Sequence, residues 1–461
     1  KLGLSRATLV CSMVTGGFLA AMQSSYLQAA EWSEEDIKSI YIYSAKNPEH
    51  AFQSEISQVT ITRAMIAESG AQDIEQLLKA YRGIDITRTG GQGSQSSIFV
   101  RGSNANHTKI LINGIAVNTA SSDTGNLNQI SLNRIEKIEI IRGARAHLYG
   151  ANTIGGVINI ITTPAPQKNH TTVGVGVGNQ ERYQAQLAHQ QHHKGQDFSA
   201  SFSGSHLGGQ NATQQDIALA NEDRDGIDQT QAELHWFNDV TLNDSRLKTG
   251  VSIVHQQGQS EFDDMNTFLS SGSEGTTDFR QDIVSGFSQI SYQKNFSTKL
   301  STSFFESEDE YTSSSYALAD TSERSRYQTK RANLSVENAW NAHLNHRFFL
   351  GVEAEKENMD LSASYATLSQ DERNNVGLYI LGDEKFSLTE KDSGTFLEWS
   401  IRTDDNDSFE RTNTTNIGLG RQITPQYFTQ LHYSTAFRAP NFNELYVEGA
   451  YSKANPLLRP E

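Results

Sequence analysis

The chain has 461 residues, a formal net charge of −16 at pH 7 and 36% hydrophobic residues. The acidic balance argues against a nucleic-acid partner. No apolar run after the N-terminus reaches the roughly 18 residues of a membrane helix, which excludes a helical membrane protein. A mean hydropathy of −0.54 still allows an outer-membrane β-barrel, because its strands alternate apolar and polar side chains.

Residues 1–30 have the layout of a secretory signal peptide. Lys1 and Arg6 precede an apolar stretch, Ala7–Met22, and small and polar residues follow it. The alternative is a first helix of the mature fold. Cys11, which lies inside this stretch, is the single cysteine of the sequence. Because a disulfide needs two cysteines, a disulfide framework is excluded. Because no Met begins the chain, we expect its start to be missing.

Two further segments follow before the middle of the chain. Residues 31–57 are polar and charged, with one β-prone island at Ile40–Tyr43. Residues 58–165 read as a small α/β domain, in which apolar residues on one face predict a helix at Ser69–Arg82 that Gly83 ends. The strands predicted for this domain are Val59–Arg63, Ile84–Thr87, Ser97–Arg101 and Thr108–Ile112.

A glycine-rich segment, Ile135–Thr163, closes this domain. Isoleucines give its first strand β-branched bulk, Arg142-Gly143 breaks that strand, and Val157–Ile161 reads as a second short strand. Gly155 and Gly156 permit backbone geometry that other residues resist. From the residues alone, this pattern is typical of a hairpin core in any α/β domain.

Residues 166–461 consist of short alternating segments separated by turn signals. Such repetition predicts a sandwich, a propeller or a barrel. Two expected loops, His206–Gln231 and Gln256–Asp278, are long, whereas those near Asn295 and Asn341–Asn345 are tight, and this asymmetry favours an outer-membrane barrel. The predicted strands are Thr172–Val177, Tyr183–Ala188, Asp197–Ser203, Gln231–Phe237, Leu247–Val254, Phe287–Tyr292, Leu300–Phe305, Ala332–Ala339, Phe348–Glu355, Gly394–Ile401, Thr414–Leu419 and Tyr427–Ser434.

The segment Ile135–Thr163 resembles the end of the plug domain of TonB-dependent outer-membrane receptors. It departs from the family signature at Ala144, where the family usually has Pro. The matching residues are Glu139, Ile141, Arg142, Gly143, Tyr149, Gly150, Gly155, Gly156, Val157, Asn159, Ile160 and Thr162.

This resemblance implies a transmembrane antiparallel β-barrel of about 22 strands with a small N-terminal α/β plug domain in its lumen. At about 10 residues per strand plus long loops, residues 166–461 are too few to complete it. The chain also ends at Arg459–Glu461 without a strand-like segment. We therefore expect a C-terminally truncated barrel.

Within the family, Gly83–Asn118 is similar to the cobalamin transporters, and His432–Tyr446 matches a barrel signature of the family. The resemblance implies TonB-dependent import of cobalamin or a related corrinoid across the Gram-negative outer membrane. It implies a monomer whose partners are a periplasmic TonB-type energy transducer, the corrinoid and outer-membrane lipids. The alternatives are the same architecture carrying a ferric siderophore or haem, and a soluble all-β surface adhesin. We found no residue pattern that suggests catalysis.

The resemblance also implies a TonB box, the segment that pairs with the transducer as an added strand. An exposed segment with β propensity and polar surroundings suits this role, although the family usually has Thr and Val here. The alternative is a linker with some β propensity. The predicted box is Ser39, Ile40, Tyr41, Ile42, Tyr43, Ser44 and Ala45.

Ligand-binding residues carried over from the cobalamin transporters lie mostly in the plug. Exposed amides and hydroxyls suit the many amide groups around a corrin ring, although any single Ser here is equally typical of a turn. The family has an apolar residue where Gln95 stands. The predicted ligand residues are Gln95, Ser97, Asn104, Ser121, Ser122, Asp123 and Asp264.

A calcium site is implied in the long outer loops. Asp223-Arg224-Asp225-Gly226 resembles a ligating D-x-D-G segment, and carboxylates at i and i+2 can converge on a hard cation that takes six to eight oxygen ligands. Solvated acidic loops are a common alternative. The predicted ligands of Ca²⁺ are Asn211, Asn221, Asp223, Asp225, Phe262, Asp263 and Asp278.

Overall fold

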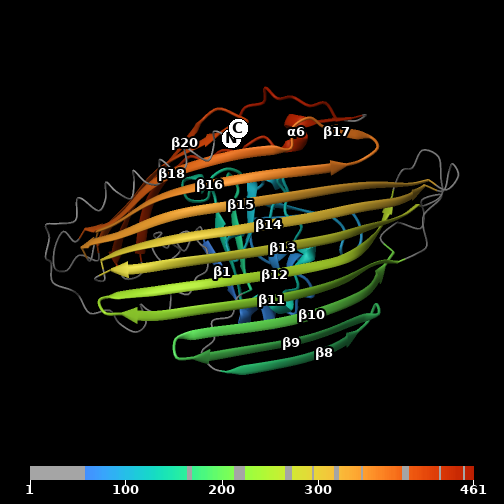
Figure 1. Cartoon of the computed structure of the whole chain (residues 1–461), viewed down its shortest axis with the longest axis horizontal. Helices are drawn as coiled ribbons and strands as arrows, with labels where there is room; N and C mark the ends of the chain where they lie inside the picture. The colour runs from blue at the N-terminus through green and yellow to red at the C-terminus, as the bar shows by residue number, and fades with distance from the viewer. Residues whose placement is uncertain are drawn as a thin grey trace.

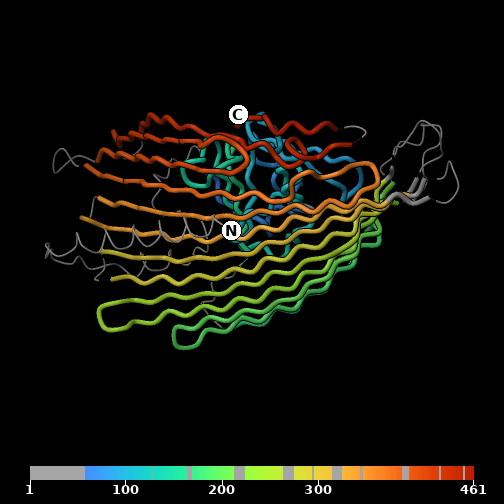
Figure 2. The backbone as a smooth tube through the Cα atoms, turned by 45° about the horizontal axis from the view of Figure 1, so that its top comes forward, coloured from blue at the N-terminus to red at the C-terminus, as the bar shows by residue number. Residues whose placement is uncertain are grey.

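The computed structural model describes residues 58–162, 169–211, 224–264, 273–292, 295–315, 321–343, 346–386, 394–424, 427–449 and 452–461. A curved antiparallel sheet of 13 strands wraps around a small α/β domain (Figure 1, Figure 2). We call the sheet the wall and the small domain the plug. No helix in the described ranges is long and apolar enough to cross a membrane.

The plug is built on a five-stranded sheet with the order β1-β6-β7-β4-β5 and a separate hairpin, β2–β3. The strands are β1 (Gln58–Thr62), β2 (Ile84–Arg88), β3 (Ser96–Val100), β4 (Thr108–Ile112), β5 (Ile115–Ala116), β6 (Lys137–Arg142) and β7 (Gly156–Ile161). The helices are α3 (Arg63–Ser69), α4 (Ile74–Lys79), α5 (Ala146–Tyr149), η2 (Ala105–His107), η3 (Leu127–Gln129) and η4 (Leu132–Arg134).

The predicted helix at Ser69–Arg82 is wrong at its start. The chain forms two helices there, because Gly70 ends α3 in the left-handed region with a φ of 66°. Asp73 then begins α4, and its side chain accepts a hydrogen bond from the backbone N–H of Gln76 at 2.7 Å. The apolar face predicted from Ile74 onward is buried, as expected.

The glycine-rich segment forms β6 and β7, which pair with each other in the centre of the plug sheet. Gly156 has a φ of 147°, and a Cβ there would lie 2.2 Å from the carbonyl oxygen of Ile141. Only glycine fits this close crossing of two chains. The carbonyl of Ala144 accepts a hydrogen bond from Ser434 of the wall at 3.2 Å, but nothing in the structure explains why Ala replaces the family Pro.

The wall runs in sequence order from β8 to β21, which are its two edge strands within the described residues. Its strands are β8 (His170–Gly178), β9 (Arg182–His193), β10 (Gln196–Gln210), β11 (Asp225–Leu242), β12 (Ser245–Asp264), β13 (Ser273–Tyr292), β14 (Phe296–Ser315), β15 (Thr321–His343), β16 (His346–Ser362), β18 (Glu372–Phe386), β19 (Thr395–Asn406), β20 (Thr412–Thr424) and β21 (Tyr427–Ser434). β17 (Ala366–Leu368) pairs outside the wall with β22 (Val447–Gly449), which follows α6 (Phe442–Tyr446).

The predicted wall strands fall on observed strands, but most are longer than predicted. β10 continues to Gln210 and β12 to Asp264, so much of the two expected long loops is strand. The prediction missed β18 because its centre is apolar on both faces. Leu378 points outward and is 44% exposed, whereas its neighbour Tyr379 is buried.

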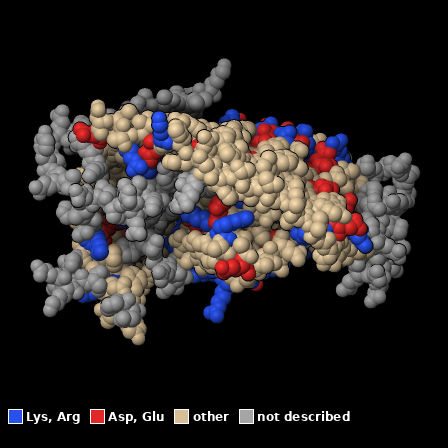
Figure 3. All heavy atoms as spheres, turned by 90° about the horizontal axis from the view of Figure 1, so that it is seen from below, with Lys and Arg blue, Asp and Glu red and all other residues tan. Residues whose placement is uncertain are grey.

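The outer face of the wall changes from apolar to charged within one step of the pleat. One row across four paired strands consists of exposed apolar residues, Leu234, Ile253, Val284 and Phe304. Two residues further along the strands, on the same face, the next row of paired residues is His255, Asp282, Glu306 and Lys330. Figure 3 shows, on one face of the molecule, a broad area without charged side chains flanked by acidic and basic ones. This banding is the pattern expected of a wall with lipid outside it.

The plug and the wall share one hydrophobic core. Val254, Ile283 and Phe305 of the wall belong to the same buried cluster as the isoleucines of the plug sheet. Ion pairs also cross between the two parts, as between Arg134 and Glu233 at 2.8 Å. The wall therefore supplies part of the apolar surface that buries the plug sheet.

Candidate functional site

A cavity of about 420 Å³ lies between one end of the plug and the wall. We call it the apical cavity. Three parts of the chain line it: plug loops, the ends of wall strands, and the segment that carries α6. The lining residues used below are Gln95, Ser121, Ser122, Phe262, Tyr311, Arg324, Tyr327, Tyr365 and Asn443.

The plug side of the apical cavity is a compact loop around Asn118–Thr124. The Asn118 side chain accepts from the N–H of Ile110 at 2.8 Å and donates to the carbonyls of Thr108 and Asp123. The backbone N–H of Thr119 donates to the Thr124 carbonyl at 2.9 Å. These contacts tie the loop to β4 and hold its hydroxyls toward the cavity.

The wall side of the apical cavity is aromatic. The hydroxyls of Tyr327 and Tyr365 lie 2.9 Å apart, and the rings of Tyr311 and Tyr327 meet edge to face at 6.0 Å. Tyrosines offer an apolar ring and a polar tip to the same ligand. Sequence reasoning missed these three residues, since strand alternation alone does not single them out among the aromatics of the wall.

The predicted ligand residues divide into those that line the cavity and those that do not. Gln95 is exposed and lines it, as do Ser121 and Ser122. Ser97 is half-buried within β3, and Asn104 is exposed at the start of η2; neither lines the apical cavity. The side chain of Asp264 lies outside the described residues.

Asp123 differs from the exposed loop residue that was expected. Its side chain is only 2% exposed, and its Oδ2 has no hydrogen-bond partner within the described part of the chain. Burial raises the pKa of the Asp123 carboxyl to about 7; Arg373 and Arg331 act against this rise, and Glu357 adds to it. Asp123 is therefore buried and is not among the residues that line the apical cavity.

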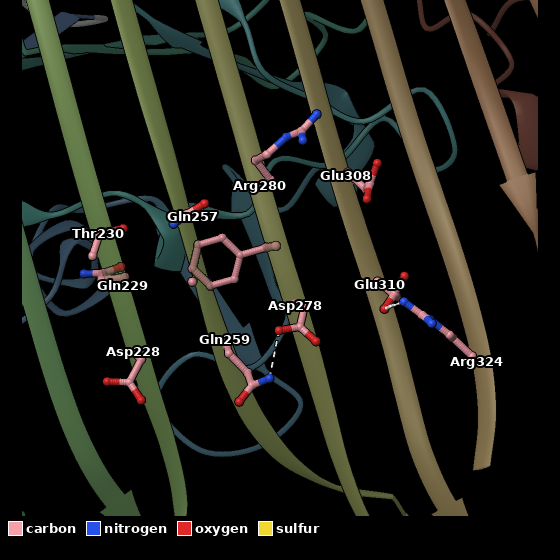
Figure 4. A pocket seen from close by; sticks show the side chains of 12 residues that line it. Asp228, Gln229, Thr230, Gln257, Gln259, Asp278, Arg280, Glu308, Glu310 and Arg324 are labelled. Carbon is pink, nitrogen blue, oxygen red and sulfur yellow. Dashed lines mark hydrogen bonds and ion pairs between the residues drawn. The ribbon is translucent and has the colours of Figure 1, made fainter. Parts of the chain in front are cut away.

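The described calcium candidates do not all lie on one face of the wall: Asn211 and Asp225 are neighbours, because Gln210 pairs with Asp225, whereas Asp278 lies on the other face. Asp225 is buried against Gly91 of the plug, and Phe262 lines the apical cavity. Asp278 instead lies on the outer face of the wall, in a recess of about 550 Å³ that shares Arg324 with the apical cavity, and there it accepts from Gln259 at 2.8 Å (Figure 4). Within the described ranges, no group of three or more His, Cys, Asp and Glu side chains could hold a metal ion.

Most of the remaining predicted site residues lie outside the part of the chain that the structure describes. The predicted TonB box, residues 39–45, and the predicted signal peptide lie outside the described residues, as do Asn221 and Asp223. The side chain of Asp263 is also outside them. Asn211 is half-exposed after the end of β10.

Comparison with known proteins places the chain among related sequences. Residues 51–157 match the family described as TonB-dependent Receptor Plug Domain. The vitamin B12 transporter BtuB of Vibrio vulnificus is 29% identical over 451 residues, which cover 95% of this chain and 67% of the relative. BtuB of Photobacterium profundum is 27% identical, with 93% and 66% covered. The chain thus spans about two thirds of the length of these relatives.

Solved structures show the same fold at low sequence identity. The siderophore receptor PirA from Acinetobacter baumannii has a TM-score of 0.70 and 15% identity, covering 88% of this chain and 66% of its own. The ferric enterobactin receptor PfeA from Pseudomonas aeruginosa has a TM-score of 0.66 and 16% identity, covering 84% and 63%. The predicted fold class, a transmembrane antiparallel β-barrel with an N-terminal plug, is confirmed.

The buried Asp123 carboxyl predicts a dependence of stability on pH. A carboxyl whose pKa is raised in the folded state favours the protonated form, so the free energy of unfolding falls as pH rises from about 4 to about 7. Asp123→Asn should remove this loss. We expect the variant to be more stable than the parent at about pH 8, with the difference shrinking toward about pH 4.

Thermal unfolding at both pH values measures this effect. Asp85→Asn, which changes an exposed carboxyl of β2, is the matched control and should follow the parent. Identical dependences of stability on pH for the parent and Asp123→Asn would contradict a raised pKa of the Asp123 carboxyl.

Proposed function

We propose that this chain, which belongs to the TonB-dependent outer-membrane receptors, imports cobalamin or a related corrinoid across the outer membrane of a Gram-negative cell. The observation that carries this proposal is the apical cavity, built jointly from plug loops and wall strands. A ligand held there contacts the plug directly. The curated relatives named as vitamin B12 transporters support the corrinoid as cargo.

The chemistry of the apical cavity suits a large ligand with a flat conjugated ring and polar edges. Tyr311 and Tyr327 offer ring surfaces and hydroxyls, and the Ser121–Ser122 side offers hydroxyls to amide groups. The chain itself catalyses no reaction in this scheme. Ligand binding exposes residues 39–45 to the periplasm, where the energy transducer pairs with them and its force rearranges the plug.

A ferric siderophore is the second candidate cargo. The structural neighbours include a siderophore receptor and a ferric enterobactin receptor. The same tyrosines and the exposed Arg324 would suit an aromatic, anionic iron chelate. The overall architecture and the transducer would be unchanged.

Calorimetric titration of the full chain in detergent with cyanocobalamin tests the cargo. We expect saturable binding that Tyr327→Ala weakens by on the order of 2 kcal/mol, roughly 30-fold, because the ring lines the cavity. Tyr433→Ala, which removes an outward-facing ring that is 62% exposed, is the control and should bind as the parent does. Binding of a ferric siderophore but not of cyanocobalamin would establish the second candidate instead.

We also propose that Ca²⁺ orders the outer segment around Asp223 and Asp225. The D-x-D-G sequence supports it, and Asp278 on the outer face has no part in it. Cyanocobalamin affinity should fall when a chelator removes Ca²⁺, and Asp225→Asn should abolish that difference. Asp278→Asn is the matched control and should keep it. A calcium effect of equal size in Asp225→Asn would remove the proposal.

Deleting residues 39–45 separates binding from transport. The deletion leaves the apical cavity intact, so the affinity for cyanocobalamin should not change. Uptake by cells should be lost, because the transducer has no strand to pair with. Uptake that continues at the parental rate would locate the TonB box elsewhere.

A further inference from the structure

We propose that Glu357, a wall residue that does not line the apical cavity, is the positioning residue that holds two sides of this cavity in register. One side is the plug loop around Ser121, and the other is the segment that carries α6. The proposal rests on the proposed function, since it assigns a role toward the ligand site described above. Four sets of contacts carry it.

The first set joins Glu357 to two guanidinium groups. Oε1 of Glu357 accepts from Nε of Arg331 at 3.1 Å and also from its Nη2, and Oε2 accepts from Arg373. All three side chains are buried, with at most 8% of each residue exposed. Each carboxylate oxygen therefore binds a different arginine from a neighbouring strand, with charge-assisted hydrogen bonds.

The second set runs from Arg331 to the plug. Its Nη1 donates to the carbonyl of Ala116 at 2.9 Å, and its Nη2 donates to that of Asn118 at 3.0 Å. On the same strand, Thr329 accepts from the backbone N–H of Ala120 at 3.0 Å. β15 thus binds the backbone just before Ser121.

The third set runs from Arg373 to the other side of the cavity. Its Nη1 donates to the carbonyl of Pro440 at 2.8 Å, and its guanidinium lies 5.1 Å from the centre of the Phe442 ring. These residues precede and begin α6, whose Asn441 caps the helix through a capping box with Glu444.

The fourth set joins the two sides directly. The backbone N–H of Phe442 donates to the carbonyl of Ala120 at 3.2 Å, and that of Asn443 donates to Ser121 at 3.3 Å. Ser121 and Asn443 both line the apical cavity. Glu357 therefore lies behind the junction at which the two sides of the cavity meet.

A buried group of charges argues for positioning rather than for stability. The cost of removing charges from water offsets their attraction, so apolar side chains of similar volume often stabilise a fold as well. Apolar side chains in place of these charges could not make the directed hydrogen bonds that Arg331 and Arg373 donate to backbone carbonyls. The buried carboxyl of Asp123 also interacts electrostatically with both arginines.

Hydrogen exchange of the ligand-free chain tests the positioning without any ligand. Glu357→Gln keeps the shape but removes the charge that holds both arginines. We expect exchange to rise about tenfold or more in residues 118–124 and 441–446. Glu233→Gln, which breaks the buried plug–wall pair with Arg134, is the matched control and should leave both segments protected. Unchanged exchange in Glu357→Gln, or a uniform rise across the plug, would overturn the proposal.

Two arginine variants should raise hydrogen exchange in different segments, whereas a general loss of stability would raise it in both. Arg331→Lys keeps the charge next to Glu357 but cannot reach both plug carbonyls, so exchange should rise mainly in residues 118–124. Arg373→Lys should raise it mainly in residues 441–446. Equal patterns in the two variants would contradict the separate roles of the arginines.

Ligand affinity provides the second measurement. Glu357→Gln should weaken cyanocobalamin binding by about 5- to 150-fold, the range typical of coupling between sites, while Glu233→Gln binds as the parent does. If the parent binds no corrinoid but the exchange pattern appears, the cargo assignment fails and the positioning role stands. If affinity is unchanged although exchange rises, Glu357 has no role in ligand binding.

Discussion

The shared core between plug and wall is the constraint on which the rest of the molecule depends. The plug sheet buries isoleucines that need an apolar partner, and Ile283 and Phe305 of the wall supply it. Without the wall, this apolar surface of the plug would face water, at a cost in free energy that grows with its area.

This constraint explains why the ligand cavity is composite. The plug loop at Ser121 is held by β15 from the wall, while Tyr311 and Tyr327 beside it belong to wall strands. Asn118 connects the loop to β4, and the sheet continues through β7 and β6 to β1. A hydrogen-bonded structure thus joins the cavity to the strand that follows the predicted TonB box.

Much of the fold could be predicted because strand alternation is a local property. The segment Tyr427–Ser434 coincides with β21, and the short plug strand Thr108–Ile112 coincides with β4. The prediction missed β18 because Tyr379 and Leu381 pack inward against Leu148 of the plug, which makes both faces of the strand apolar. Alternation disappears in this strand because its inner face meets an apolar part of the plug.

The candidate site was less predictable than the strands, because its side chains come together only through tertiary packing. Ser121 and Ser122 were found by resemblance and line the cavity, but Tyr327 and Asn443 come from distant parts of the chain and carry no local signal. Asp123, two residues from Ser121, turned out to be buried. A single loop can direct neighbouring side chains to opposite sides, and spacing in the sequence does not reveal which.

The family resemblance, the two-part architecture and the strand pattern could be read from the amino-acid sequence, because each depends on local motifs and on a two-residue period. Which side chains share a space is visible only in the folded chain. The tertiary structure set Asp278 on the outer face and Asp225 on the inner one, and it brought Glu357 behind the plug loop. These outcomes depend on strand register and on how the plug is seated, which are long-range packing choices that no short segment encodes.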